Sequence, residues 1–376
     1  MSRSTSLAGL YVHVPFCLSK CPYCDFNSTT DLGMLPVWLS ALEEECRLQR
    51  GLFGPFDTVY VGGGTPSILD DRQLDRLVTT LHRSFDIVHG AETTLEVNPD
   101  DVSPDRLKSF RSLGFNRISL GVQSLQEEDL RFLGRRHGVG GTLRALEWVR
   151  SSGFDCVGLD LIYGFHTDRR SCHRSLWEKT LGQALSFDPD HLSCYLLTIE
   201  GDTPFRSLLA EGRLTLPSEG ELEAIFLFTS EFLESEGFIH YEVSNFARSR
   251  TSFCRHNGKY WDHSPYLGLG PSAHSFADGV RWWNVASVRR YSETLERGRL
   301  PREGFEVLSE EQIDLEKLFL GFRTRDGVEA PLLLKRPEAS HVVDRLTASG
   351  IVEKRDGRIR PTRKGFLLAD GLPLLF

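Results

Sequence analysis

Short strand-like runs alternate with segments of helical periodicity in the first half of this chain, and this alternation restricts the fold more than any other feature. Between the runs, apolar residues recur at helical spacing, as in Leu74, Leu77, Val78 and Leu81. Six β–α repeats predict a parallel sheet with right-handed crossovers. Six strands are too few for a closed eight-stranded barrel, so a partial, open barrel and a doubly wound sheet both fit. The six predicted strands are Leu10–Val14, Thr58–Val61, Thr94–Val97, Arg117–Val122, Val157–Ile162 and Leu192–Thr198.

The pattern changes near residue 200. Pro217–Gly237 predicts one long helix with Ile225, Phe228 and Phe232 on its apolar side, whereas the following segment to residue 285 is rich in aromatic residues and glycine and has little periodicity. From about residue 305 the spacing predicts two helices and a final hairpin, an arrangement that resembles a winged-helix unit. We therefore expect an α/β barrel in residues 1–200, a helical and aromatic/Gly-rich region in 201–304 and a winged-helix-like end in 305–376.

Charge and hydropathy exclude several classes of protein. The chain has 44 Lys plus Arg against 52 Asp plus Glu, a net charge of −8, whereas a nucleic-acid binder needs a basic face. The basic residues of the final hairpin are therefore interpreted as a solvated wing, and a winged-helix regulator is the weakest of the functions considered. No run approaches the ~18 apolar residues of a membrane span, and the N-terminus lacks the apolar stretch of a signal peptide. A cytoplasmic protein without a nucleic-acid partner is expected.

Three of the eight cysteines lie close together, and the other five are scattered. The cluster Cys17-Leu-Ser-Lys-Cys21-Pro-Tyr-Cys24 directly follows the first predicted strand, where a loop can direct three sulfurs toward one metal centre. Structural zinc is one interpretation, but such a site normally takes four protein ligands, and no second Cys or His pair follows at zinc-finger spacing. A cubane [4Fe–4S] cluster with three protein ligands is the other, and it leaves one iron open for a small molecule.

The C-x3-C-x2-C spacing resembles the signature of the radical S-adenosylmethionine (SAM) superfamily. The resemblance implies a partial (β/α)6 barrel, a [4Fe–4S] cluster on Cys17, Cys21 and Cys24, and SAM bound at the open iron. It also implies an electron donor if SAM is cleaved. A barrel of this kind carries its site at the carboxyl ends of the strands, which is where the cysteine cluster falls.

Further motifs make the resemblance more specific. YVHVPFCLSKCPYCDFNS, GGGTPS, LEVNPDD, ISLGVQS, LGRRH and LDLIYG look like the oxygen-independent coproporphyrinogen III oxidase group over nearly the whole chain. Most of these motifs stand at or just beyond the end of a predicted strand, where polar side chains exceed what core patterning requires. The resemblance implies that Tyr23 shapes the SAM pocket and that SAM is contacted by Tyr11, Gly63, Gly64, Thr65, Glu96, Gln123, Arg135 and Asp160.

Two branches of that group differ in function, and three features favour the haem-chaperone branch, HemW, over the oxidase, HemN. The oxidase has a fourth cysteine where this chain has Phe26, and it has a long segment before the cluster where this chain has sixteen residues. The stretch from His256 to Trp261 matches the HNxxYW motif of the HemW branch.

The HNxxYW motif has a chemical interpretation as a haem site. A neutral imidazole can ligate haem iron, and neighbouring aromatic rings can stack on the porphyrin, so His256, Tyr260 and Trp261 are candidate haem contacts. His256 as an ordinary structural histidine is an equal alternative, and His274 and Cys254 are weaker candidate ligands. The expected function is a haem chaperone that delivers haem to apo-haemoproteins, including ones at the membrane surface. The alternative is SAM-dependent oxidative decarboxylation of coproporphyrinogen III.

Overall fold

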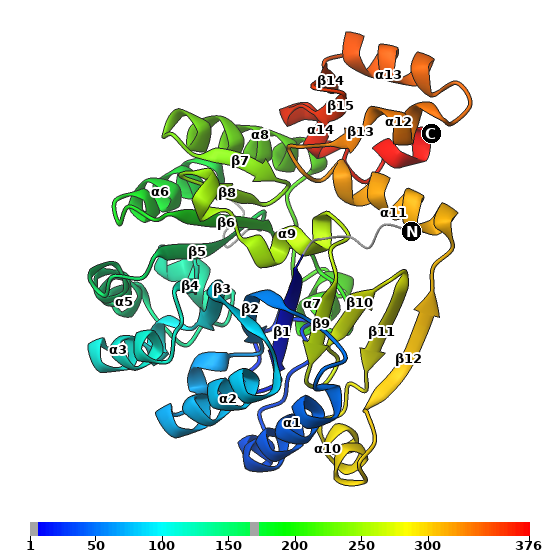
Figure 1. The fold of residues 1–376 in the computed structure, drawn as a ribbon. Helices are drawn as coiled ribbons and strands as arrows, with labels where there is room; N and C mark the ends of the chain where they lie inside the picture. The colour runs from blue at the N-terminus through cyan, green and yellow to red at the C-terminus, as the bar shows by residue number, and fades with distance from the viewer. Residues whose placement is uncertain (1–6, 166–172) are drawn as a thin grey trace.

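The computed structural model describes residues 7–165 and 173–376, and its largest element is a single 12-stranded sheet (Figure 1). The six central strands are parallel and neighbour one another in chain order, as the sequence predicts. They curve into the open barrel, so the partial-barrel prediction is confirmed. The strands are β1 (Ala8–Val14), β2 (Phe56–Gly63), β3 (Ile87–Val97), β4 (Arg117–Gln123), β5 (Cys156–Tyr163) and β6 (His191–Leu196).

Helices cover the outer face of these strands (Figure 1). The alternation of a β-strand explains the two faces: Val59 and Val61 of β2 enter the main apolar core, while Tyr60 between them faces the barrel interior. Helix α2 begins with a capping box between Asp70 and Gln73. The helices between these strands are α1 (Leu35–Gln49), α2 (Asp71–Ser84), α3 (Pro104–Ser112), α4 (Glu127–Phe132), α5 (Val139–Ser151) and α6 (His173–Leu185).

The middle segment extends the barrel sheet at both edges, which the sequence analysis missed. Strands β7 and β8 pair antiparallel beside β6, and β9 joins β1 in parallel before β10, β11 and β12 continue antiparallel. These strands have only three to six residues, too few for a two-residue period to be recognised. The elements are α7 (Pro204–Ala210), α8 (Glu219–Ser235), β7 (Ile239–Glu242), β8 (Asn245–Ala247), α9 (Arg255–Trp261), β9 (Tyr266–Leu269), β10 (His274–Ala277), β11 (Val280–Asn284), α10 (Val288–Glu296) and β12 (Arg302–Val307).

The C-terminal segment has its own small apolar core and a three-stranded sheet in the order β13-β15-β14. The winged-helix-like interpretation stays a prediction, for which the structure supplies the helices and a β14–β15 hairpin. Basic side chains of the hairpin have acidic partners, as in Lys354 with Asp344 at 2.6 Å. The elements are α11 (Glu310–Gly321), β13 (Val328–Glu329), α12 (Ala330–Leu334), α13 (Ala339–Ala348), β14 (Val352–Arg355), β15 (Arg358–Pro361) and α14 (Arg363–Leu367). In the two described ranges, no helix combines the length and the apolar character needed to cross a bilayer.

A buried carboxyl group lies where the barrel sheet meets the C-terminal segment. Glu242 is the last residue of β7, and its backbone forms an isolated antiparallel β-bridge with Thr324. The neighbouring Val243 N–H donates to the Arg323 carbonyl at 2.9 Å. Burial raises the pKa of Glu242 to about 8, and its Oε1 has no hydrogen-bond partner among the described residues. The pKa of Glu242 is higher in the folded chain than in the unfolded chain. The stability that the protonated Glu242 contributes is therefore complete below about pH 4.5 and is lost as the pH rises toward 8.

Replacing Glu242 with glutamine is therefore expected to have a pH-dependent effect on stability. The variant should match the parent chain at pH 4 and gain about 1–3 kcal/mol in free energy of unfolding at pH 9, because glutamine does not ionise. Thermal unfolding at the two pH values measures this, with Glu223→Gln on the exposed face of α8 as the control. An equal effect of Glu242→Gln at both pH values would contradict the assignment.

Candidate cofactor-binding site

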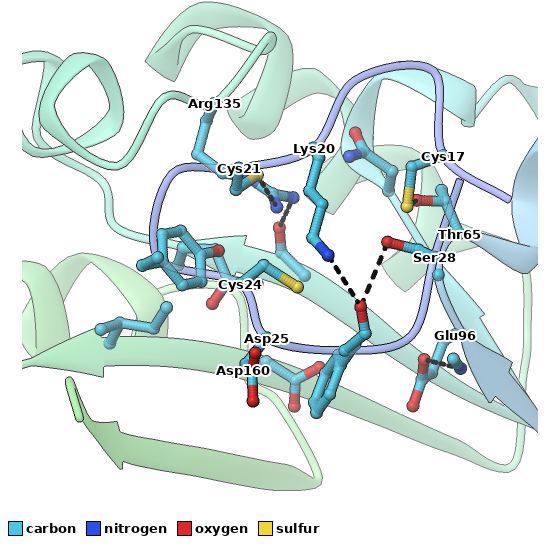
Figure 2. Close-up of a pocket in the computed structure, with 18 of the residues that line it drawn as sticks. Cys17, Lys20, Cys21, Cys24, Asp25, Ser28, Thr65, Glu96, Arg135 and Asp160 are labelled. Carbon is cyan, nitrogen blue, oxygen red and sulfur yellow. Dashed lines mark hydrogen bonds between the residues drawn. The ribbon is translucent and has the colours of Figure 1, made fainter. Parts of the chain in front are cut away.

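A cavity of about 430 Å³ lies where the cysteine loop meets the carboxyl ends of the parallel strands (Figure 2). Its position follows from topology, because parallel strands bring their carboxyl ends to one edge. All three loop cysteines line it. So do eight of the nine residues predicted for SAM, namely Tyr23, Gly63, Gly64, Thr65, Glu96, Gln123, Arg135 and Asp160.

Hydrogen-bond donors are already directed at two of the three loop sulfurs. Thr65 Oγ1 lies 3.4 Å from Cys17 Sγ, and Arg135 Nη1 lies 3.6 Å from Cys21 Sγ. Such donors stabilise thiolates that ligate a metal cluster. Among the described residues, no three Cys, His, Asp or Glu side chains are close enough to share one metal ion. A cubane does not require such a group, because each thiolate binds a different iron, so the loop fits a three-cysteine [4Fe–4S] site.

The turn that follows β2 approaches the cysteine loop through its backbone. Gly63 has a φ of 113° and donates its N–H to Glu96 Oε2 at 3.0 Å, and Gly64 donates to the Val14 carbonyl at 2.8 Å. A Cβ on Gly64 would lie 2.6 Å from the Phe16 carbonyl oxygen. Both positions therefore need glycine, which lets the backbone of the turn pack closely against the residues before and at the start of the cysteine loop.

Two carboxyl groups face the same cavity from neighbouring parts of the sheet. Burial, and then the charge of Asp160, raise the pKa of Glu96 to about 7. Burial also raises the pKa of Asp160, which accepts a hydrogen bond from Ser119 Oγ at 2.9 Å. A bound cation would stabilise the ionised form of both carboxyl groups and so offset the free-energy cost of burying their charge. The cavity therefore suits a ligand with positive charge. SAM carries a sulfonium and an amino group and fits this requirement.

Tyr11 is the predicted SAM contact that does not line the cavity. Its hydroxyl group contacts His13 Nδ1 at 3.0 Å, and its ring lies beside Tyr60 with ring centroids 6.2 Å apart. Direct contact of Tyr11 with SAM stays a prediction, and in this arrangement Tyr11 lies against the residues that support the pocket.

Several lining residues were not predicted from the sequence, and Tyr60 and Tyr195 are the largest of them. A signal for Tyr60 was present, because it stands two residues before Gly62 on a strand and therefore on the same face as the glycine turn. Tyr195 has no motif of its own. Its place depends on the pairing of β6 with β5, where Asp160 lies opposite Ser193.

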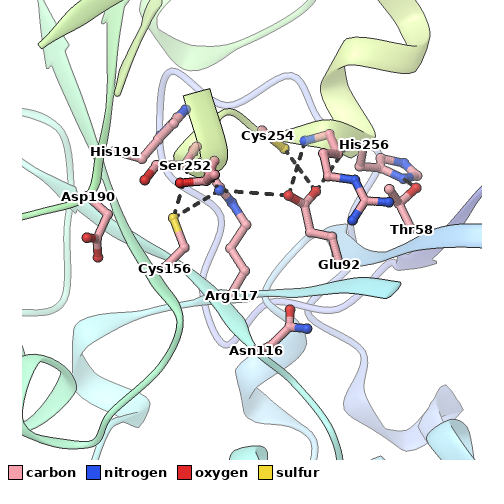
Figure 3. Close-up of polar contacts among 12 residues, drawn as sticks. Thr58, Glu92, Asn116, Arg117, Cys156, Asp190, His191, Ser252, Cys254 and His256 are labelled. Atoms are coloured by element: carbon pink, nitrogen blue, oxygen red, sulfur yellow. Dashed lines mark hydrogen bonds and ion pairs between the residues drawn. The ribbon is translucent and has the colours of Figure 1, made fainter. Parts of the chain in front are cut away.

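The HNxxYW motif forms helix α9, which lies near the amino ends of the strands, where His256 meets Thr58 of β2 (Figure 3). His256 is only 1% exposed. Its Nδ1 is 2.8 Å from Thr58 Oγ1, and its Nε2 is 2.9 Å from the Tyr260 hydroxyl. Burial lowers the pKa of His256 to about 3, so the ring is neutral. Neither ring nitrogen is free for haem iron in this arrangement, and haem ligation by His256 requires α9 to move.

The other candidate haem contacts lie in different surroundings. Trp261 follows on α9, and its buried Nε1 has no partner within the described part of the chain. Cys254 is buried, and burial raises the pKa of its thiol to about 12. His274 is exposed and stacks on Trp283 with ring centroids 5.8 Å apart. The structure therefore does not bring these residues together into one haem pocket.

Comparisons with known proteins identify the family. Residues 11–172 match the Radical SAM superfamily. The chain is 36% identical over 370 residues to the heme chaperone HemW of Mycobacterium tuberculosis strain H37Rv, an alignment that covers 97% of this chain and 93% of that protein. It is 34% identical over 375 residues to the heme chaperone HemW of Bacillus subtilis strain 168, with 96% of each chain covered. The chain belongs to the HemW family.

The fold agrees with this assignment. The solved structure of coproporphyrinogen III oxidase (HemN) from Escherichia coli, described as a radical SAM enzyme, superimposes with a TM-score of 0.83 at 25% identity and covers 99% of this chain and 91% of that chain. The [4Fe–4S] cluster and SAM, predicted from the cysteine spacing, are the cofactors of the superfamily to which this HemW-family chain belongs.

Proposed function

We propose that this HemW-family chain is a cytoplasmic haem chaperone, which binds a [4Fe–4S] cluster, SAM and haem and transfers haem to apo-haemoproteins. The full-length similarity to two proteins named heme chaperone HemW supports the haem function. Recipients that are membrane proteins would meet the chain at the membrane surface. When bound, a reduced cluster supplies one electron to the SAM sulfonium, so cleavage of SAM would need an external electron donor.

The observation that carries the proposal is the apolar mouth of the cavity. Four large side chains that line the cavity remain substantially exposed, namely Leu18 (47%), Phe26 (66%), Tyr195 (40%) and Leu196 (37%). Apolar surface of this kind, gathered around one opening, favours a large apolar ligand. Phe26 is also the residue that stands where the oxidase has a cysteine.

Cationic side chains at the same opening complement the carboxylates of a tetrapyrrole. Lys20 and Arg136 both line the cavity, and Lys20 Nζ donates to the Phe26 carbonyl at 3.2 Å. Haem combines a flat apolar face with two propionates, so an apolar mouth with positive charge beside it suits haem. The mouth is thus the proposed first contact for haem, and the HNxxYW residues His256, Tyr260 and Trp261 are a second contact that needs α9 to open.

Haem titration of the anaerobically reconstituted protein tests the proposal. The parent chain is expected to bind about one haem per chain. Phe26→Asp should weaken haem binding about tenfold, because it removes an apolar contact and adds a negative charge beside the propionates. Leu52→Asp is the control, since Leu52 is 67% exposed and does not line the cavity.

Two other results of the haem titration would change the proposed function or the proposed haem contact. No haem binding by the reconstituted parent chain would remove the chaperone function. Loss of binding in a His256 variant with no loss in Phe26→Asp would move the haem contact from the mouth to α9.

The oxidase activity is the second candidate, and the similarity to the HemN structure favours testing it. The cavity holds groups for a cluster and SAM, and its apolar mouth would also accept a porphyrinogen. Incubation with coproporphyrinogen III, SAM and a low-potential reductant, without oxygen, would give the divinyl product if the chain is an oxidase. We expect no turnover.

A further inference from the structure

Helix α9, which carries the HNxxYW motif, is fixed at the base of the barrel by buried polar contacts (Figure 3). Glu92 on β3 accepts hydrogen bonds from the backbone N–H groups of Arg255 at 3.1 Å and His256 at 3.0 Å. Arg117 on β4 lies 3.9 Å from Glu92, and both side chains are less than a tenth exposed. A carboxylate at the first N–H groups of a helix satisfies donors that would otherwise have no partner. The position of His256 is therefore set by the barrel strands.

The His256 ring lies against Tyr60, a residue of the cofactor cavity. Their ring planes are 28° apart and their centroids are separated by 5.2 Å, which is a stacked arrangement. His256 is held on both sides by Thr58 and Tyr260, so the ring cannot rotate away from Tyr60 without breaking a buried and a partly buried hydrogen bond. The base of the barrel thus determines where the Tyr60 ring lies.

Tyr60 is connected to the glycine turn through Glu96. Its hydroxyl group donates to Glu96 Oε1 at 2.9 Å, and Glu96 Oε2 accepts the Gly63 N–H at 3.0 Å. The contact is tight, since a Cβ on Gly62 would lie 2.8 Å from Glu96 Oε1 and 2.8 Å from Tyr60 Cε1. A displaced Tyr60 would therefore move Glu96 and the turn backbone, both of which line the cavity.

A parallel set of contacts reaches the cysteine loop. The Tyr11 ring lies beside that of His256 with centroids 6.3 Å apart, and the Tyr11 hydroxyl contacts His13 Nδ1 at 3.0 Å. His13 Nε2 in turn contacts the Asn27 carbonyl, three residues beyond Cys24, at 2.7 Å. Contacts that begin at helix α9, near the amino ends of the strands, therefore reach both the glycine turn and the cysteine loop.

The geometry points to His256 of the HNxxYW motif as a positioning residue for SAM, which acts through Tyr60 and Glu96 on the glycine turn. This role belongs to the cofactor site and does not require haem. It also accounts for why His256 is buried with both imidazole nitrogens occupied. Tyr60 has the same positioning role, because its hydroxyl group bonds the Glu96 carboxylate that accepts the Gly63 N–H.

The affinity for SAM, measured from the SAM-induced change in the EPR spectrum of the reduced cluster, tests this role. His256→Ala and Tyr60→Phe should each weaken SAM binding about tenfold, because each substitution removes a support of Glu96 and the glycine turn. His256→Phe keeps a ring against Tyr60 but loses the hydrogen bonds to Thr58 and Tyr260, so its loss of SAM affinity should be smaller, about threefold. In the double variant, His256→Ala should add less than about twofold to Tyr60→Phe, because the two residues act in series.

A buried histidine elsewhere separates positioning from general stability. His240 on β7 bonds Ser230 at 2.9 Å and stacks on Phe246 at 4.1 Å, and it does not line the cavity. His240→Ala should lower the melting temperature and leave the SAM affinity unchanged. Unchanged SAM affinity in both His256→Ala and Tyr60→Phe, or additive effects in the double variant, would overturn the proposal. If His256→Ala does not fold, a tenfold loss in His256→Phe or no loss in Tyr60→Phe would also overturn it.

Discussion

Replacing Cys24 with alanine should abolish assembly of the iron–sulfur cluster. The parent chain, reconstituted without oxygen, is expected to hold about four irons and four sulfides, and the variant fewer than about one of each, because a cubane held by two thiolates is readily lost. Iron and sulfide analysis, visible absorption and EPR of the reduced protein measure this. SAM should then produce no spectral change in the variant.

Cys46→Ala is the matched control, because Cys46 is a buried cysteine of helix α1 within the main apolar core. Its loss should reduce stability slightly and leave the iron content unchanged. If Cys24→Ala retained a full complement of iron, the three-cysteine site would be wrong. If the parent chain bound zinc in place of iron, the radical SAM chemistry would not apply.

Replacing Gly64 with alanine should have the second largest effect, on SAM binding. The added Cβ would lie 2.6 Å from the Phe16 carbonyl oxygen and 3.0 Å from its carbonyl carbon and its amide nitrogen, and the backbone of the cysteine loop cannot yield as a flexible side chain would. The turn and the cysteine loop would have to separate. We expect SAM affinity to fall more than about tenfold, with a parallel loss of cluster occupancy.

Gly182→Ala provides the control for this substitution. Gly182 lies in helix α6, and a Cβ there meets no heavy atom within 4 Å. Alanine at this helical position should raise stability by up to about 1 kcal/mol and leave SAM binding unchanged. Equal SAM affinity in Gly64→Ala and in the parent chain would mean that the turn does not form part of the SAM site.

The central fold and most of the cofactor site could be predicted from local sequence. The six parallel strands follow from runs such as Arg117–Val122, which are long enough to show their character, and the cluster follows from three cysteines within one loop. Glycines and polar residues at strand ends then fall together, because every parallel strand ends at the same edge of the sheet. The short strands β7 to β12 escaped prediction because so few residues do not establish a period.

The surroundings of the HNxxYW motif could not be predicted from local sequence. The sequence by itself determined that a histidine, a tyrosine and a tryptophan stand close together on the chain, and that three thiolates can hold a cluster. Only the tertiary structure decided that His256 lies buried between Thr58 and Tyr260, beneath Tyr60 and apart from the apolar mouth at Phe26. The physical reason is that ligands within one loop are brought together by local geometry. The environment of a single histidine depends instead on contacts with strands about 200 residues away in the chain, such as the Thr58 contact across 198 residues.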